Sequence, residues 1–169
     1  MEAMRACPVP LPCRGGFDAG SIPANRITVN RKIEMNIILS IKPKWARLIY
    51  EGKKTIEWRK TAPQRGKVIP DITKVFLYET SPVKGITGYF ILAPYYFVFD
   101  VNKDSREIYP EEMDRIEQSC VDIKDLKKYQ GENKNIYGLP IHRFEKFDHL
   151  ETLESFGIKR PPQSWRYVE

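Results

Sequence analysis

The sequence predicts a mixed α/β (α+β) domain, a small β-barrel with short flanking helices. The first observation is the order of the hydrophobic patterns, which read strand, helix, strand, several strands, two helices and further strands. The second is that aromatic and β-branched residues crowd residues 73–100, as in a strand-rich segment. The third is length, because 169 residues suffice for one domain with a substantial core.

The first 34 residues differ from the remainder of the chain. They are rich in Pro, Gly and Ala, show no sustained period, and lack the clean apolar run of a signal peptide. We therefore expect residues 1–34 to be a disordered or mis-called N-terminal leader, and residues 35–169 to form the domain.

The domain is expected to begin with a buried strand and a short helix. Residues 36–41 form an apolar, β-branched run that favours a strand. Pro43 suits the first turn of a helix, because its fixed φ fits there and its missing N–H is not needed. An apolar stripe starts at Trp45, and Gly52 is placed to end the helix in a left-handed conformation.

A second strand follows this helix, and it carries charged side chains. The period changes to two, so Thr55, Glu57 and Arg59 point to one face while Ile56 and Trp58 point to the other. A guanidinium offers a planar fork for a phosphate or a carbonyl edge, and a carboxylate accepts from an amino group or a hydroxyl. The alternative is an ordinary exposed Glu–Arg pair on a solvated strand face.

These residues carry a resemblance to a known family. A helix followed by Gly52, Lys54, Thr55, Glu57 and Arg59 resembles the signature of the ASCH domain, which belongs to the PUA-like superfamily of small β-barrels. The leading ILSIKPKWA and the closing GIKRPPQSW are also similar to the family, so the resemblance covers residue 35 to the C-terminus. It implies a PUA-like fold with a cleft between barrel and helices, floored by the signature strand.

The next segments are expected to be a basic loop and several strands. Residues 61–71 form a loop that carries Arg65 and Lys67. A strand over 73–80 and two shorter strands within 83–100, separated at Pro94, follow it. Bases stack on exposed aromatic faces, so Tyr78 and Tyr96 are stacking candidates, although rings in such segments more often fill a core.

The last third of the chain is expected to hold two helices and the closing strands. The first helix enters at residues 109–112, and Asp122 caps a second that runs through Tyr129 and ends at Gly131. A strand over 134–145, a short helix or turn over 149–156 and a final strand complete the domain. In ASCH-like chains the closing segment lies near the signature strand, so the resemblance adds Arg160, Gln163 and Ser164 as secondary site candidates.

Charge points to an anionic partner. The net charge is +6, and residues 42–67 contain nine Lys or Arg against two Glu. The three cysteines and two histidines show neither a disulfide framework nor a zinc spacing, so we expect a cytoplasmic protein with no metal and no cofactor. No apolar run approaches the roughly 20 residues that cross a bilayer, and no membrane partner is expected.

We therefore expect an RNA-binding protein acting in RNA metabolism or in the regulation of transcription or translation. Single-stranded or modified RNA would occupy a basic cleft, with stacking on aromatic rings. The candidate RNA-binding residues are Lys54, Thr55, Glu57, Arg59, Arg65, Lys67, Tyr78, Tyr96, Arg160, Gln163 and Ser164.

Two other classes remain open at this stage. In a ribonuclease, Lys54 would stabilise phosphorane charge and Glu57 would act as general base, so these two are the catalytic candidates. Superfamily members that remove the acetyl group of N4-acetylcytidine are thought to use a threonine where this chain has Glu57. A carboxylate cannot replace that hydroxyl without a change of mechanism, which disfavours an amidohydrolase. A protein-binding regulatory adaptor is the third class.

Overall fold

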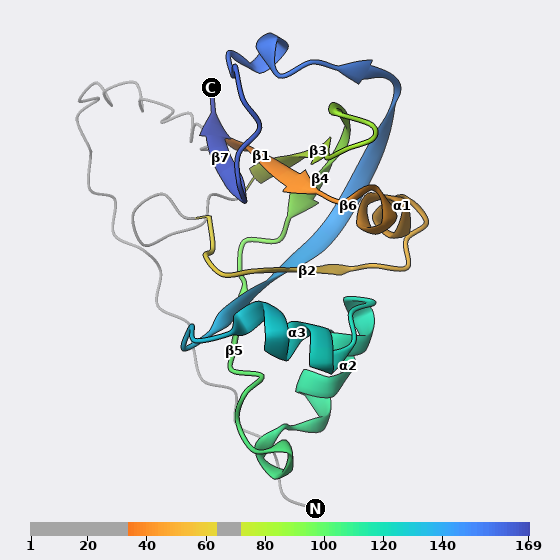
Figure 1. Ribbon diagram of the computed structural model, residues 1–169. Helices are drawn as coiled ribbons and strands as arrows, with labels where there is room; N and C mark the ends of the chain where they lie inside the picture. Colours follow the sequence, from red (N-terminus) through yellow and green to blue (C-terminus); the bar gives the residue numbers. More distant parts are fainter. Residues whose placement is uncertain (1–33, 64–71) are drawn as a thin grey trace, which may run out of the picture. The chain divides into compact units, whose positions relative to one another are not determined.

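The computed structural model describes residues 34–63 and 72–169, all within one compact unit, residues 31–169 (Figure 1). The predicted leader, apart from Glu34, lies outside the described residues, as do Arg65 and Lys67. The elements in chain order are β1 Glu34–Ile41, α1 Pro43–Tyr50, β2 Ile56–Arg59, β3 Ile72–Glu79, β4 Gly85–Leu92, β5 Phe97–Phe99, α2 Pro110–Gln118, α3 Ile123–Gln130, β6 Ile136–Glu151 and β7 Trp165–Val168, with 3₁₀ turns at Ser105–Glu107 and Glu154–Phe156.

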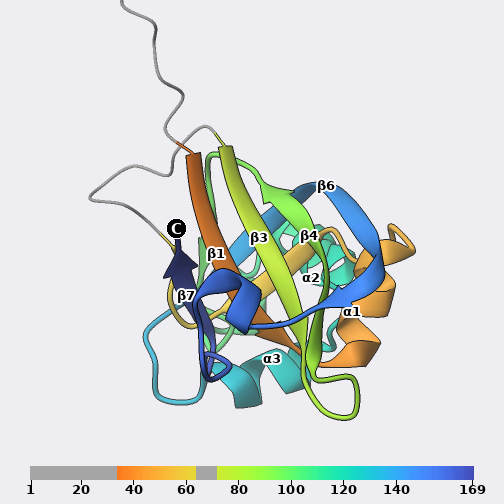
Figure 2. The same cartoon turned by 90° about the horizontal axis from the view of Figure 1, so that it is seen from above.

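The strands form one curled, seven-stranded sheet, a half-barrel, which confirms the mixed α+β class. The order is β2-β6-β4-β3-β1-β7, with β5 pairing with β6. Strands β1 and β3 run parallel, and every other pair among the described strands is antiparallel. Figure 2 shows β7, β1, β3 and β4 side by side, with β6 curling away behind them. The predicted cap residues are also confirmed: Gly52 has φ +69°, and the Asp122 side chain accepts from the Lys124 N–H at 2.7 Å.

Strand β6 holds the two halves of the sheet together. Its first residues pair with β2 on one side and β5 on the other, and its later residues pair with β4. The prediction of a helix or turn from His149 was wrong, because β6 continues to Glu151, which pairs with Ile86 of β4. Cross-strand pairing outweighs the weak local preference of these residues, and only residues 154–156 form a helical turn.

Three buried clusters stabilise the unit, and two of them flank β2. One packs α1 against the inner face of the sheet and includes Leu39, Ile49 and Leu77. A second joins β2 and β5 to α2 and α3, and includes Trp58 and Leu126. The third lies under the C-terminal segment: Ile38, Tyr78, Ile86, Leu153 and Ile158. Strand β2 therefore runs along the seam between the first and second clusters.

A close backbone approach anchors α1 to the sheet. The Tyr50 hydroxyl lies 2.7 Å from the Thr87 hydroxyl, and burial raises the pKa of Tyr50 to about 12. Next to this contact, Gly88 faces β6 so closely that a Cβ would lie 2.2 Å from the Glu145 carbonyl oxygen and 2.9 Å from the Tyr50 hydroxyl. Only glycine fits at this position without a backbone shift.

Gly88→Ala is therefore expected to lower the free energy of unfolding by about 1–3 kcal/mol or more, the usual cost of overpacking a filled site. Urea denaturation measures the change. Gly85→Ala is the matched control on the same strand, because its nearest neighbour is the Leu150 side chain at 3.3 Å, which can move aside. Equal losses in both variants would contradict this explanation.

Candidate functional site

Strand β2 is held at both ends by the helical segment α2–α3. At its start, the Thr55 N–H donates to the Gln118 carbonyl at 2.9 Å, and the Ile141 N–H of β6 donates to the Thr55 carbonyl at 2.8 Å. At its end, the Lys60 ammonium lies 5.3 Å from the centre of the Tyr129 ring of α3. Along its length it pairs with β6, where Gly138 leaves the space that the Trp58 ring fills. These contacts fix the backbone from which the charged side chains project.

Lys54 is the most deeply buried of these side chains, with 1% of its surface exposed. Its ammonium donates to the Ser119 carbonyl at the C-terminal end of α2, at 2.6 Å. It also lies 3.2 Å from Glu57 Oε2 and 5.3 Å from the centre of the Trp45 ring. A helix C-terminus, a carboxylate and an aromatic face are all favourable neighbours for a cation, so the charge is well supported.

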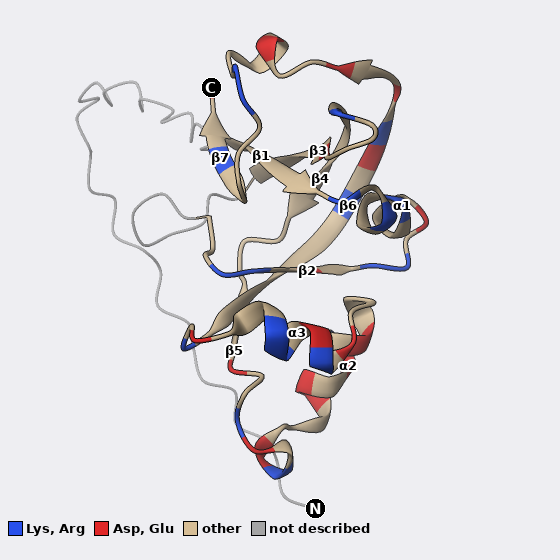
Figure 3. Ribbon diagram, viewed as in Figure 1, with Lys and Arg blue, Asp and Glu red and all other residues tan. Residues whose placement is uncertain are grey.

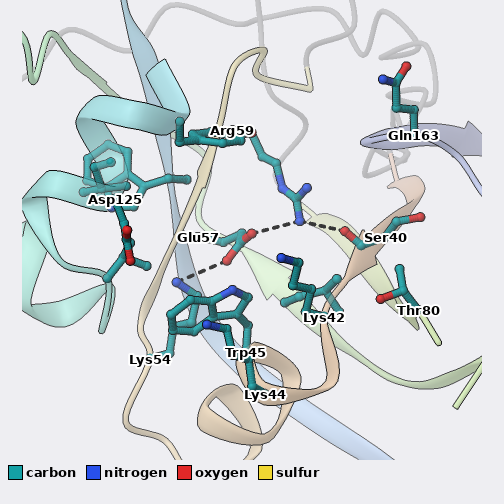
Figure 4. Close-up of a pocket in the computed structure, with 15 residues that line it drawn as sticks. Ser40, Lys42, Lys44, Trp45, Lys54, Glu57, Arg59, Thr80, Asp125 and Gln163 are labelled. Atoms are coloured by element: carbon teal, nitrogen blue, oxygen red, sulfur yellow. Dashed lines mark hydrogen bonds and ion pairs between the residues drawn. The ribbon is translucent and has the colours of Figure 1, made fainter. Parts of the chain in front are cut away.

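Glu57 connects Lys54 to Arg59. Its second oxygen, Oε1, lies 2.8 Å from Arg59 Nη2, which also donates to the Ser40 carbonyl of β1 at 2.9 Å (Figure 4). Glu57 and Arg59 are 6% and 9% exposed, so both charges are largely removed from water. Nε of Arg59 is enclosed and has no hydrogen-bond partner within residues 34–63 and 72–169. The result is a buried row of alternating sign, cation, anion, cation, with a net charge of +1.

The row forms the floor of an open pocket of about 540 Å³. One wall comes from β1, α1 and the end of β3, and the opposite wall comes from the α2–α3 corner and α3 (Figure 4). The lining residues are Ser40, Ile41, Lys42, Lys44, Trp45, Lys54, Glu57, Trp58, Arg59, Thr80, Val121, Asp125, Leu126, Tyr129 and Gln163.

The pocket carries excess positive charge, and the charge is uneven. Four lining residues are Lys or Arg and two are Asp or Glu, which gives 4 − 2 = +2. Exposed Lys42 and Lys44 lie on the α1 wall, whereas Asp125 and Tyr129 lie on α3. Figure 3 shows basic residues on α1 and acidic residues along α2. Burial is the main cause that raises the pKa of Tyr129, so its hydroxyl stays protonated at neutral pH. An anionic group is therefore favoured on the α1 side of the pocket.

The structure brings four of the sequence-predicted residues into this pocket: Lys54, Glu57, Arg59 and Gln163. Three others do not line it. The Thr55 side chain faces Gln118, with Oγ1 at 3.4 Å from Oε1. Ser164 accepts a hydrogen bond from the Ser40 N–H through its carbonyl at 2.9 Å, which holds the closing segment against β1. Arg160 is exposed and does not line the pocket.

The two predicted stacking tyrosines do not line the pocket. Tyr78 is 7% exposed and packs in the cluster with Ile38 and Ile86, because its side of β3 faces the C-terminal segment. Tyr96 is partly buried against the core under α1, with its ring 5.4 Å from that of Tyr137 in an edge-on contact.

Other pocket residues were missed by the sequence reasoning. The periodicity predicts Trp45 in the apolar stripe of a helix, but in the structure Trp45 lines the pocket. Lys44 Nζ lies 4.2 Å from the centre of the Trp45 ring. Tyr129 and Asp125 read as ordinary helix residues. The lysines in KPKW were an available signal, because Lys42, Lys44 and Trp45 lie at the start of the helix that leads into the signature.

The described part of the chain holds no cluster of three or more His, Cys, Asp or Glu that could bind a metal ion. Within the same residues, no helix has the length and apolar character needed to cross a membrane.

Comparison with known proteins gives the family. The ASCH domain model matches residues 39–148, well over half of the chain. The chain belongs to the ASCH domain family. The match includes the end of β1, all of α1, the signature strand and the α2–α3 wall, so all parts of the pocket except Gln163 lie within it. None of the curated protein sequences matches this chain.

Solved structures agree on the fold. The ASCH protein from Zymomonas mobilis superposes with a TM-score of 0.62 at 21% identity, over 79% of this chain and 87% of that one. Two mutant forms of that protein, each solved separately, give TM-scores of 0.63 and 0.61 at 19% and 20% identity, over 79% of this chain and 88% and 90% of those chains. At this identity the likeness shows the fold alone, which is the PUA-like fold that the resemblance implied.

Glu57→Gln is expected to lower the free energy of unfolding by about 3–5 kcal/mol, because two buried cations then lose their shared carboxylate. Urea denaturation at neutral pH measures the loss. Glu51→Gln is the matched control: Glu51 pairs with Arg47 at 2.8 Å on the surface, so little change is expected. A Glu57 variant as stable as the wild type would show that the row does not depend on its central charge.

Proposed function

We propose that this protein binds single-stranded or modified RNA, with a nucleotide seated in the pocket above β2. The observation that carries the proposal is that one open cavity is lined both by buried Arg59, which the Ser40 carbonyl holds in place, and by the exposed Lys42 and Lys44. Phosphate groups favour such a combination of a guanidinium fork and mobile ammonium groups. Members of the ASCH domain family are generally thought to bind RNA, which supports the same conclusion.

The size and lining of the cavity favour a single strand over a duplex. A cavity of about 540 Å³ is in the range of small-ligand pockets, so it suits one nucleotide, whereas a duplex keeps its bases stacked inside. Trp45 and Tyr129 offer aromatic surface to a base, and Gln163 offers both a donor and an acceptor. On the α3 wall, the Asp125 carboxylate is placed to accept from an amino group or a ribose hydroxyl.

The contacts of Glu57 favour binding over hydrolysis. A general base needs a free oxygen near the proton that it removes. Here Oε1 is held by Arg59 at 2.8 Å and Oε2 faces Lys54 at 3.2 Å. Lys54 in turn is directed to the Ser119 carbonyl. We infer a binding module that acts in RNA metabolism or in the regulation of transcription or translation in the cytoplasm.

The double variant Lys42→Gln, Lys44→Gln is expected to weaken binding to a labelled 12-nucleotide single-stranded RNA about tenfold. The slope of log K against log salt should become shallower by about 1.4, since each phosphate contact on a single strand contributes about 0.7. Fluorescence anisotropy across a salt series measures both values.

The control is Arg143→Gln, because Arg143 is exposed on β6 and does not line the pocket. It should bind as the wild type does. If the wild type binds neither single-stranded RNA nor a shorter RNA at low salt, or if the double variant matches the control, the proposed function is wrong. Turnover of the RNA during the assay would favour the ribonuclease instead.

A further inference from the structure

The two buried cations of the pocket differ in how fully their hydrogen-bonding groups are used. The ammonium of Lys54 has three N–H groups, and its three near neighbours are the Ser119 carbonyl, Glu57 Oε2 and the Trp45 ring. With 1% of its surface exposed, it has no open side toward solvent. An RNA phosphate could reach Lys54 only after one of these contacts had broken.

The hydrogen-bonding groups of Arg59 are less fully used than those of Lys54. A guanidinium has five N–H groups. Within the described residues, Arg59 donates through Nη2 alone, to Glu57 Oε1 and to the Ser40 carbonyl. Its Nε is buried with no partner in the described part of the chain. Arg59 lines the pocket and has guanidinium N–H groups outside its two Nη2 hydrogen bonds, so it can take an added acceptor such as a phosphate or a base carbonyl.

We propose that Lys54 is a positioning residue and that Arg59 is the RNA contact that it positions. This inference rests on the proposed function. Lys54 fixes one oxygen of Glu57, so the other oxygen and the Ser40 carbonyl hold the Nη2 end of Arg59. The remaining edge of the guanidinium is then kept in one orientation before RNA arrives, which lowers the ordering cost of binding.

The inference also gives a role to the corner between α2 and α3. The Ser119 hydroxyl donates to the Ile116 carbonyl at 2.6 Å and accepts from the Val121 N–H at 3.3 Å, and the side chain is fully buried. These bonds set the position of the Ser119 carbonyl that receives Lys54. Ser119, which carries no charge itself, therefore acts on RNA through Lys54 and Glu57.

The test compares the salt dependence of RNA binding in three variants. Arg59→Gln should weaken binding to the 12-nucleotide RNA about tenfold or more and make the salt slope shallower by about 0.7, the value of one phosphate contact. Lys54→Met and Ser119→Ala should also weaken binding, but with a slope close to that of the wild type. Circular dichroism at the assay temperature confirms that each variant is folded.

A double-mutant cycle adds a second measurement. Because Lys54 and Ser119 act through the same row, the double variant should bind no worse than Lys54→Met alone, whereas Ser119→Ala and Arg143→Gln should combine additively.

If Lys54→Met makes the salt slope as shallow as Arg59→Gln does, Lys54 contacts phosphate and the inference is overturned while RNA binding stands. If the wild type does not bind RNA, the proposed function and this inference fall together. If Lys54→Met does not fold, a cycle of Ser119→Ala with Arg59→Gln decides: a double variant that binds no worse than Arg59→Gln supports the inference, and additive losses overturn it.

Discussion

The pocket depends on one interaction, the burial of the Lys54 ammonium beneath the end of α2. A lone ammonium in that position would be strongly disfavoured, so its neighbours must supply negative potential. The Ser119 carbonyl and Glu57 supply it from two directions. Once Glu57 is fixed in this way, Arg59 has a defined place, and the Ser40 carbonyl completes it. One buried charge thus orders β2, α2 and β1 relative to each other.

The sheet is shaped to make this arrangement possible. Strand β6 pairs first with β2 and then with β4, so a single strand connects the α2–α3 side to the side that carries α1. Strand β2 is short and would be a weak element alone. It gains stability from β6, from Trp58 packed over Gly138, and from the hydrogen bonds of Thr55 at its start. A short strand with such support can carry three buried charges.

Local patterns in the sequence were enough to predict most elements, since each depends on signals within a few residues. Pro43 and Gly52 set the ends of α1, and Asp122 set the start of α3. The continuation of β6 to Glu151 could not be predicted, because it comes from pairing with distant Ile86. The ASCH signature singled out Lys54, Glu57 and Arg59, and all three line one pocket in the structure.

The partners of those charges were beyond the reach of sequence. The acceptor for Lys54 is a backbone carbonyl, and any residue type at position 119 carries one. The alternation on β2 left open an exposed Glu–Arg pair on a solvated face, yet all four residues of β2 are buried, because α2 and α3 cover one side and the charged row fills the other. Trp45 fits the apolar stripe of a helix as well as it fits a pocket lining, so the sequence alone could not show that it lines the pocket.

The two walls of the pocket belong to different buried clusters, and this has a mechanical consequence. Ile41 and Trp45 pack with the cluster under α1, whereas Val121 and Leu126 pack with the cluster around α2 and α3. The buried row crosses this gap, because Lys54 is bonded to Ser119 on one side, Arg59 is bonded to Ser40 on the other, and Glu57 links the two. The row therefore ties two separately packed cores together, and losing its central carboxylate would uncouple the walls without disturbing the packing inside either core.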